Sequence, residues 1–303
     1  MSSDPLIVVF SDVDSVVTAS EPAAFTAAAR ALKRLAGDNV ALAFCSSRTR
    51  AELEHVWQGG LGVSHPLLSE CGGALFLPHR YFPFDVPNAR DIVGYRAVEF
   101  GRPYASVAAA LHRVADRLQI AVRGFGDMSV EEVARESGMT LLQAHLAKLR
   151  EYGELFHVVD PSSVTRNRLF KGLQAGGLHA VNVGTYDHVG APAGLSLGIE
   201  LLRSLYRHAH GALLSVGMVD VKSSGELLRF VDYPVFVHRG DVVEMPWRVQ
   251  RSAAAPVAYM EDVAAWAAAI VSIVERLRRK PKASHFQSAA ADAPRAAKRR
   301  VSE

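Results

Sequence analysis

Two aspartates two positions apart, Asp12 and Asp14, have the residue type and spacing best suited to chemistry in this chain. They follow the apolar run 6–10, and a short run rich in β-branched residues is typical of a buried strand in a parallel sheet. Open α/β sheets bind ligands at the carboxyl ends of such strands, where both carboxylates could face one substrate. The pair could serve as a nucleophile with a general acid/base, or as part of a hard-metal site. The alternative is a solvated turn in which aspartate acts as a cap.

Strand and helix patterns alternate in the first and in the last part of the chain. This alternation predicts an α/β fold with a doubly wound parallel sheet around these aspartates. In the first part we expect a helix up to residue 35, a strand over 40–45, a helix over 50–58, and two strands joined by a Gly-Gly turn within 67–76. In the last part we expect a helix over 196–208, strands over 213–217 and 233–237, and a terminal helix within 257–277.

The alternation pauses near residues 83–87, and the next segment has helices and short strands of its own. The helices are predicted over 104–119 and 139–152, and the strands over 155–159 and 179–183. This pattern indicates an α+β cap domain inserted into the core. The predicted organisation is a first core part over 1–82, the cap over 83–192, a second core part over 193–280, and a disordered basic tail over 281–303.

The composition narrows the classes of function. The net charge of +3 is small for 303 residues, and the basic tail lacks interleaved aromatic residues, so no nucleic-acid partner is predicted. Two cysteines, Cys45 and Cys71, provide neither a disulfide framework nor a zinc site, which indicates a reducing compartment. The most apolar segment, residues 263–274, is shorter than the ~20 residues of a membrane span, and no signal peptide is recognised. We expect a cytoplasmic protein without a membrane partner.

Polar segments follow four of the predicted sheet strands: Asp12 with Asp14, residues 46–48, residues 69–73 and residues 217–222. Together these segments resemble those of the haloacid dehalogenase (HAD) superfamily of phosphatases, over about residues 5–275. Within that superfamily, the cap segments 123–128 and 148–152 are similar to those of mannosyl-3-phosphoglycerate phosphatases. Residues 72–76 and 232–235 are also similar to that family.

The resemblance implies hydrolysis of a phosphomonoester. Asp12 is implied to attack phosphorus and form an aspartyl-phosphate, while Asp14 protonates the leaving oxygen and then activates water. Ser46 is implied to donate a hydrogen bond to the phosphate, assisted by the backbone amides of Ser47 and Arg48 at a helix N-terminus. The Arg48 side chain either adds positive charge there or lies on the surface.

The resemblance also implies a Mg²⁺ cofactor and substrate contacts from the cap. The Asp12 carboxylate, the Asp14 carbonyl and acids from the fourth polar segment would hold the ion, and Asp220 is the carboxylate in that segment. The implied substrate contacts in the cap are Arg123, Asp127, Arg150 and Glu151. For Arg150 and Glu151 the alternative is an exposed pair on an amphipathic helix.

The fourth segment departs from the family pattern of Gly-Asp followed four residues later by another Asp. Counted from Gly217, the two acidic positions hold Met218 and Lys222, and Asp220 is offset from both. The family lysine where the cap returns to the core also has no counterpart in residues 194–198. Lys222 could place a fixed positive charge beside Asp12 and neutralise a phosphate without metal, or it could be a solvated lysine.

Two functions from different classes therefore remain. One is an enzyme, a Mg²⁺-assisted phosphatase acting on a phosphorylated sugar or glycerate derivative, weak or with an altered metal site. The other is a non-catalytic protein that binds a small phosphorylated ligand in the same pocket. Loss of one transition-state donor costs ~10²–10³ in rate, and a metal that neutralises phosphate charge contributes several kcal/mol more. The sequence predicts no oligomeric state and does not identify the ligand.

Overall fold

The structure is a computed structural model that describes part of the chain. The described residues are 4–12, 22–37, 39–55, 65–160, 162–220, 225–238, 257–259 and 262–279. None of the helices in these ranges is long and apolar enough to cross a membrane.

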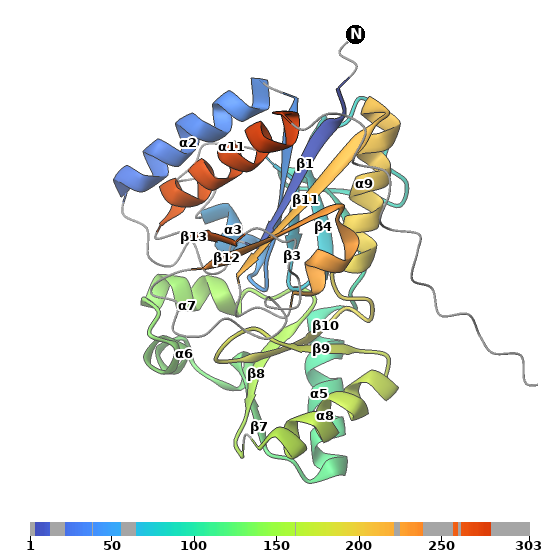
Figure 1. The fold of residues 1–303 in the computed structure, drawn as a ribbon. Coiled ribbons are helices and arrows are strands. Elements are labelled where there is room, and N and C mark those ends of the chain that lie inside the picture. Colours follow the sequence, from blue (N-terminus) through green and yellow to red (C-terminus); the bar gives the residue numbers. More distant parts are fainter. Residues whose placement is uncertain are drawn as a thin grey trace, which may run out of the picture.

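A large, mostly parallel sheet forms the core (Figure 1). Within the described residues its strand order is β13 (Val257–Tyr259), β12 (Tyr233–His238), β11 (Leu213–Asp220), β1 (Leu6–Asp12), β2 (Val40–Cys45), β3 (Leu67–Ser69), β4 (Ala74–Pro78), β6 (Tyr95–Glu99) and β5 (Arg90–Ile92). Neighbours from β13 to β3 are parallel, and those from β3 to β5 are antiparallel. The apolar run before Asp12 is thus a buried central strand, as predicted.

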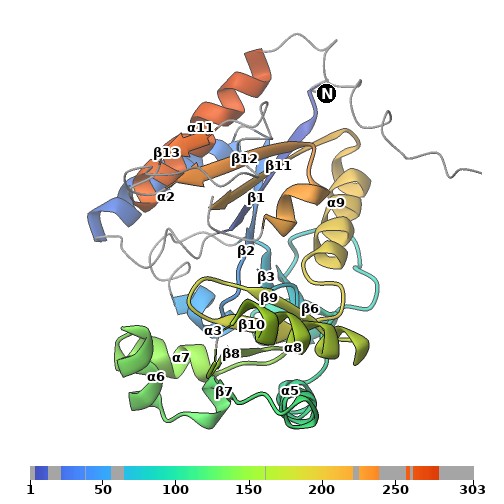
Figure 2. The ribbon, with the colours of Figure 1, turned by 60° about the horizontal axis from the view of Figure 1, so that its bottom comes forward.

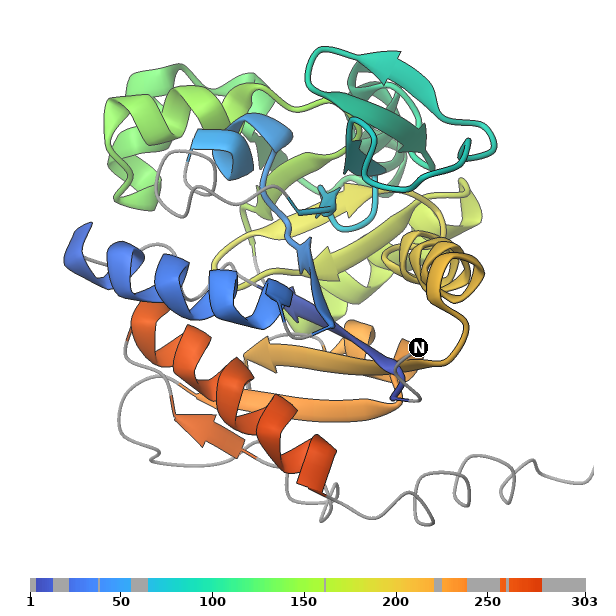
Figure 3. The ribbon, with the colours of Figure 1, turned by 90° about the horizontal axis from the view of Figure 1, so that it is seen from above.

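Helices cover both faces of this sheet (Figure 3). The helices α2 (Pro22–Gly37) and α11 (Val263–Arg279) lie side by side on one face, and α9 (Ser196–His210) lies on the other. Trp266 of α11 packs with Phe44 in the first core cluster, and Ile199 of α9 belongs with Phe10 to the second. The short helix α3 (Arg50–Leu53) and the 3₁₀ helix η3 (Glu226–Phe230) follow β2 and β11.

A second unit lies beside the carboxyl ends of the parallel strands (Figure 2). Its antiparallel sheet has the order β7 (Val122–Gly124), β8 (Glu154–Val158), β10 (Asp187–Gly190) and β9 (His179–Asn182). Its helices are α5 (Tyr104–Leu118), η2 (Phe125–Asp127), α6 (Val130–Ser137), α7 (Leu141–Lys148) and α8 (Ser163–Ala175). We call this unit, residues 101–190, the cap.

The predicted class, an α/β parallel sheet with an inserted α+β unit, is confirmed. Three details differ from the expected elements. The sheet topology places β5 and β6 on the core sheet, although the cap was expected to begin at residue 83. The helix expected over residues 139–152 is α7, which ends at Lys148. The terminal helix begins only at Val263, because residues 257–259 add strand β13 to the sheet edge. The predicted disordered tail, 281–303, lies outside the described residues.

Candidate active site

Asp12 lies where an open α/β sheet is expected to bind its ligand. It is the last residue of β1, half-buried, and it is paired with Cys45 at the end of β2. From β1 the chain continues to β2 and β3 on one side, and it returns to β11 and β12 on the other. The strand order reverses at β1, and the carboxyl ends around such a switch point form the binding crevice. Asp14 lies outside the described residues.

The loop between β2 and α3, residues 46–49, is fixed by backbone hydrogen bonds to β3 and to the turn that follows it. Ser46 N–H donates to Leu68 O at 3.0 Å, and Ser46 O accepts from Cys71 N–H at 2.9 Å. Ser46 is 4% exposed, and its Oγ accepts the N–H of Arg48 at 3.0 Å. The Arg48 amide, expected to assist phosphate binding directly, is thus directed at the Ser46 hydroxyl.

The Arg48 side chain forms an ion pair with a residue of α3, the helix that follows this loop. Its Nη1 lies 3.0 Å from Oε1 of Glu52, whose side chain is 4% exposed. Glu52 also completes the capping box of α3, because its carboxylate accepts the N–H of Thr49 while Thr49 Oγ1 accepts the N–H of Glu52. The Arg48 charge is therefore compensated by Glu52, and the side chain is neither a plain surface arginine nor an uncompensated charge for phosphate.

The structure places the acid of the fourth segment differently from the sequence prediction. β11 extends to Asp220, three residues beyond the expected end at Gly217. Met218 is 0% exposed inside this strand, is paired with Ser11 of β1, and belongs to the first core cluster. It therefore does not occupy a ligand position in a loop. Asp220 ends the strand beside β1, and Lys222 lies outside the described residues.

Two carboxylates thus end neighbouring parallel strands, Asp12 on β1 and Asp220 on β11. Carboxylate oxygens are the ligands that Mg²⁺ prefers, and Mg²⁺ is commonly bound by one or two carboxylates together with water and substrate phosphate. The donor types fit this ion. Across the residues that the structure describes, which leave out Asp14, no group of three or more His, Cys, Asp or Glu side chains could hold a metal by themselves.

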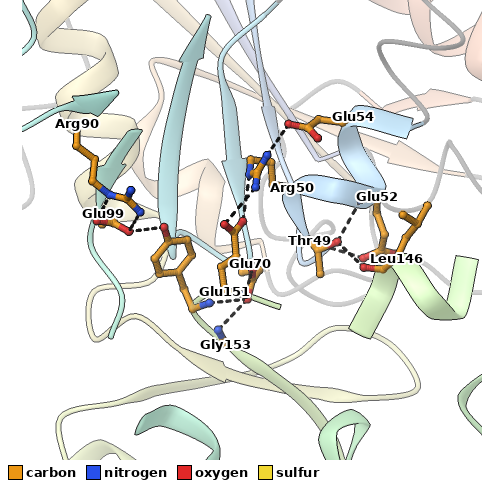
Figure 4. A network of polar contacts seen from close by, with 11 residues as sticks. Thr49, Arg50, Glu52, Glu54, Glu70, Arg90, Glu99, Leu146, Glu151 and Gly153 are labelled. Atoms are coloured by element: carbon orange, nitrogen blue, oxygen red, sulfur yellow. Dashed lines mark hydrogen bonds and ion pairs between the residues drawn. The ribbon is translucent and has the colours of Figure 1, made fainter. Parts of the chain in front are cut away.

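Glu70 joins the turn after β3 to the cap. Its side chain is 0% exposed, and its carboxylate accepts the backbone N–H groups of Glu151 at 2.9 Å, Tyr152 at 3.0 Å and Gly153 at 2.8 Å (Figure 4). Burial raises the pKa of this carboxyl, while Arg150 and the three N–H donors act in the opposite direction. One buried side chain of the core thereby fixes three consecutive residues of the cap.

Arg150 is buried at the same junction, with a side chain only 1% exposed. Its Nε donates to Gly153 O at 2.7 Å, its Nη2 donates to Ser47 O at 3.1 Å, and Nη2 lies 3.6 Å from Oε2 of Glu70. Arg150 follows the end of α7, so the alternative of an exposed pair on a helix is wrong. The sequence-predicted cap residue closest to the predicted phosphate site is thus bonded to the 46–49 loop itself.

Two more contacts connect the 46–54 segment with the cap. Arg50 donates to the Glu151 carboxylate through Nε at 3.2 Å and Nη2 at 3.3 Å, and its Nη1 donates to Glu54 at 2.8 Å (Figure 4). Thr49 Oγ1 donates to Leu146 O at 2.9 Å. Glu151, expected to contact substrate, is therefore paired with a core arginine.

Buried polar groups continue from Arg150 into the cap. Oε2 of Glu154, which is 2% exposed, accepts from Tyr104 Oη at 2.7 Å and Gly126 N–H at 3.2 Å, and burial raises its pKa. His188 is 1% exposed, and burial together with the Arg150 charge holds its pKa well below the ordinary value. The junction therefore contains several polar groups that are removed from water.

The close approach of cap and core depends on glycine at the β3–β4 turn. A Cβ on Gly73 would lie 2.5 Å from Cβ of Tyr152. A Cβ on Gly72, which has φ +92°, would lie 2.1 Å from the carbonyl oxygen of Gly194 where the chain returns from the cap. A larger residue at Gly73 would push Tyr152 away, and one at Gly72 would push Gly194 away.

The other two predicted cap residues have partners within the cap. Arg123 on β7 forms ion pairs with Glu132 at 2.7 Å and Glu136 at 2.6 Å. Asp127 accepts the N–H of Gly124 at 2.7 Å and lies 3.2 Å from Nε2 of His112. These contacts stabilise the β7–α6 region, and no described contact joins Arg123 or Asp127 to the core.

Sequence reasoning missed Glu70, Thr49 and Arg50 as parts of the junction. The available signal for Glu70 was an acid placed between a strand and a Gly-Gly turn. Its backbone has φ +49° and that of Cys71 has φ +53°, a conformation that non-glycine residues rarely adopt. Thr49 with Glu52 is a sequence-readable capping box, but its third bond, to Leu146, joins residues far apart in the chain.

Solved structures that match this fold include HAD-superfamily phosphatases. A HAD phosphatase from Bacteroides thetaiotaomicron matches with a TM-score of 0.58 and 14% identity, over 90% of this chain and 96% of that one. A HAD subclass IIB sugar phosphatase matches with a TM-score of 0.58 and 11% identity, over 88% and 98% of the two chains. The fold is therefore the HAD-type α/β fold with a cap.

Curated relatives then define the family, although no protein-family model matches the sequence. The glucosyl-3-phosphoglycerate/mannosyl-3-phosphoglycerate phosphatase of Methanococcoides burtonii is 30% identical over 234 residues, which are 77% of this chain and 85% of that protein. The protein of the same name from Persephonella marina is 27% identical over 233 residues, 76% and 84% of the two chains. The chain belongs to this family of HAD-superfamily phosphatases, which confirms the resemblance read from its motifs.

Proposed function

We propose that this chain hydrolyses a phosphomonoester of a sugar or glycerate derivative through an aspartyl-phosphate on Asp12. The placement of Asp12 carries the proposal. It ends the central strand at the switch point, with the Ser46 loop after the neighbouring strand on one side and Asp220 on the other. A nucleophile, a hydroxyl donor and a second carboxylate thus come from three adjacent strand ends.

In the first step, a carboxylate oxygen of Asp12 attacks phosphorus while the bond from phosphorus to the substrate oxygen breaks. Asp14 donates a proton to that leaving oxygen. In the second step, Asp14 takes a proton from water, which attacks phosphorus and releases the Asp12 carboxylate and inorganic phosphate. Ser46 donates a hydrogen bond from its hydroxyl to a phosphate oxygen, while its Oγ accepts the N–H of Arg48.

Asp12, Asp14 and Asp220 are the proposed ligands of Mg²⁺, which when bound would neutralise phosphate charge. With Asp220 as the first acid of the fourth segment, the position four residues later is Ser224. The segment then keeps one of its two acids, and a serine replaces the other. The role of Lys222 as an additional positive charge beside Asp12 stays a prediction. A Lys222→Ala variant that binds inorganic phosphate as well as the wild type would contradict that role.

The proposed substrates are glucosyl-3-phosphoglycerate and mannosyl-3-phosphoglycerate, the compounds in the names of the curated relatives. Arg150 and Glu151, at the junction beside the 46–49 loop, are the predicted cap residues best placed to influence the substrate. We place the activity in the cytoplasm, with a small phosphorylated molecule as the partner.

The test is an assay of the purified protein on both phosphoglycerates and a panel of phosphosugars, with Mg²⁺ and with EDTA. We expect turnover that EDTA suppresses and that Asp12→Asn lowers on the order of 10³-fold or more. The matched control is Asp85→Asn, which changes a fully exposed aspartate outside the cap and should keep the activity. Binding of the phosphoglycerates at micromolar concentration without any turnover would instead support the non-catalytic alternative.

A further inference from the structure

The 46–49 loop, which the proposed function assigns to phosphate binding, is held in part by the cap. Nη2 of Arg150 donates to Ser47 O at 3.1 Å, although the two residues are 103 positions apart. The Arg150 side chain is 1% exposed and Ser47 is half-buried, so this bond is partly shielded from water, which strengthens a charged donor. One peptide unit of a core loop is thus fixed by a cap guanidinium.

That peptide unit connects Arg150 with the Ser46 hydroxyl. The carbonyl of Ser47 and the N–H of Arg48 belong to the same planar peptide group, in which they point in opposite directions. The carbonyl accepts from Arg150, and the N–H donates to Ser46 Oγ at 3.0 Å. Rotation of this peptide would break both bonds. Arg150 therefore fixes the amide that orients the Ser46 hydroxyl.

The guanidinium is itself held from two directions. Its Nε donates to Gly153 O at 2.7 Å, and Glu70 fixes the backbone of residues 151–153 through three N–H groups. Its Nη1 is buried and has no hydrogen-bond partner among the described residues. A buried donor left without a partner costs free energy, so packing alone does not account for an arginine at this position.

We propose that Arg150 is a positioning residue of the phosphate-binding loop, acting through the Ser47–Arg48 peptide on the Ser46 hydroxyl. The inference rests on the proposed function for the identity of the bound group. It gives the cap a second role besides substrate recognition, because cap and core build the phosphate site together. A docked cap is then a condition for binding any phosphomonoester, whatever its organic part.

This role and a substrate-contact role differ in their dependence on the substrate. A residue that contacts the sugar or glycerate part affects the natural substrate and leaves a minimal phosphate ester unchanged. A residue that positions the phosphate loop affects both equally, and it also affects inorganic phosphate. Hydrogen bonds to charged groups contribute ~1.5–3 kcal/mol, so we expect losses of about 10- to 100-fold.

The experiment compares the variants Arg150→Ala and Arg150→Lys with a matched control, Arg117→Ala. Arg117 is an exposed arginine on cap helix α5. Each full-length protein is assayed on mannosyl-3-phosphoglycerate and p-nitrophenyl phosphate, and inorganic phosphate binding is measured by calorimetry. We expect equal loss of kcat/KM on both esters with Arg150→Ala, a matching loss in phosphate affinity, partial rescue with lysine, and no change with Arg117→Ala. Loss confined to mannosyl-3-phosphoglycerate overturns the proposal.

Hydrogen exchange of residues 46–54 gives a readout that does not depend on activity. We expect faster exchange of the Arg48 and Thr49 amides in both Arg150 variants, and unchanged exchange overturns the positioning role. If the Ala variant does not fold, the Lys variant carries the same comparison. A wild-type protein without turnover or phosphate binding refutes the proposed function, while the exchange result still decides whether Arg150 fixes the loop.

Discussion

The near and far ends of the cap place the same residue type in opposite surroundings. Arg150, next to the core, has a side chain 1% exposed and bonds to the backbone carbonyls of Gly153 and Ser47. Arg123, on edge strand β7, has a side chain 34% exposed and pairs with Glu132 and Glu136. Both arginines come from the segments that carry the family resemblance.

The difference separates a junction residue from a local surface contact. Exposed ion pairs contribute little, because water and salt screen them and their flexible side chains lose entropy. A buried charge depends on every partner, because removing one leaves the others unpaired in a low dielectric. We therefore expect substitutions at the junction to have large effects, and substitutions around Arg123 to have small ones.

The largest effect is expected for Glu70→Ala. The change leaves Arg150 and three backbone N–H groups of residues 151–153 without their buried acceptor, and breaking a buried pair in this way costs about 3–5 kcal/mol. The free energy of unfolding from urea titration measures it. Glu70→Gln, which keeps one acceptor oxygen, should lose less. A cost below about 1 kcal/mol for the Ala variant is incompatible with a junction held by Glu70.

Gly73→Ala is expected to have the next largest effect. The added Cβ would lie 2.5 Å from Cβ of Tyr152, and forcing extra atoms into a packed site costs about 1–3 kcal/mol. Gly138→Ala, at the far end of the cap, is the matched control because its Cβ would meet nothing within 4 Å. Its only cost is a φ of +72°, worth about 1 kcal/mol. Activity should fall only with Gly73→Ala. Equal activity of the two variants argues against close packing of the cap on the core at Gly73.

Acid should weaken the junction through His188, whose pKa is held well below the ordinary value by burial and by Arg150. The unfolded chain then binds a proton that the folded chain does not. The contribution of neutral His188 to the free energy of unfolding is fully present above the pKa of about 6.5 of an unfolded histidine, and it is lost as the pH falls below that value. The loss is about 1 kcal/mol at pH 5.5.

Urea unfolding at pH 7.5 and 5.5, with His188→Leu for comparison, isolates this contribution because the variant should lose about 1 kcal/mol less between the two pH values. In the core, burial lowers the pKa of His65 to about 4, so His65→Phe should show the same direction of change. An identical pH dependence in wild type and His188→Leu contradicts a neutral buried His188.

The smallest effect is expected for Arg123→Ala. Its two ion pairs are partly exposed to solvent, with side chains 28–35% exposed, and no described contact joins this side chain to the core. We expect kcat/KM for mannosyl-3-phosphoglycerate to change less than about twofold, since such pairs contribute little. Loss of activity as large as that of Arg150→Ala would show that the far end of the cap also contacts substrate.

Much of the fold was readable from local patterns. The central strand before Asp12, the hairpin around the Gly-Gly turn and the helices at residues 104 and 196 were predicted close to their observed positions. The end of β11 was not. Gly217 looked like the end of a strand, but pairing with β12 continues as far as Asp220 opposite Val237. Strand length depends on the neighbouring strand, which a local pattern does not contain.

The sequence by itself determined the α/β class, the family, and the position of Asp12, the proposed nucleophile, at a strand end, because these depend on periodicity and on motifs a few residues long. Only the tertiary structure decided which acid ends β11, that Glu70 holds the cap, and that Arg150 bonds to Ser47 whereas Arg123 does not reach the core. These contacts join residues about 80 to 100 positions apart. Their strength comes from burial, which arises only where the cap packs against the core.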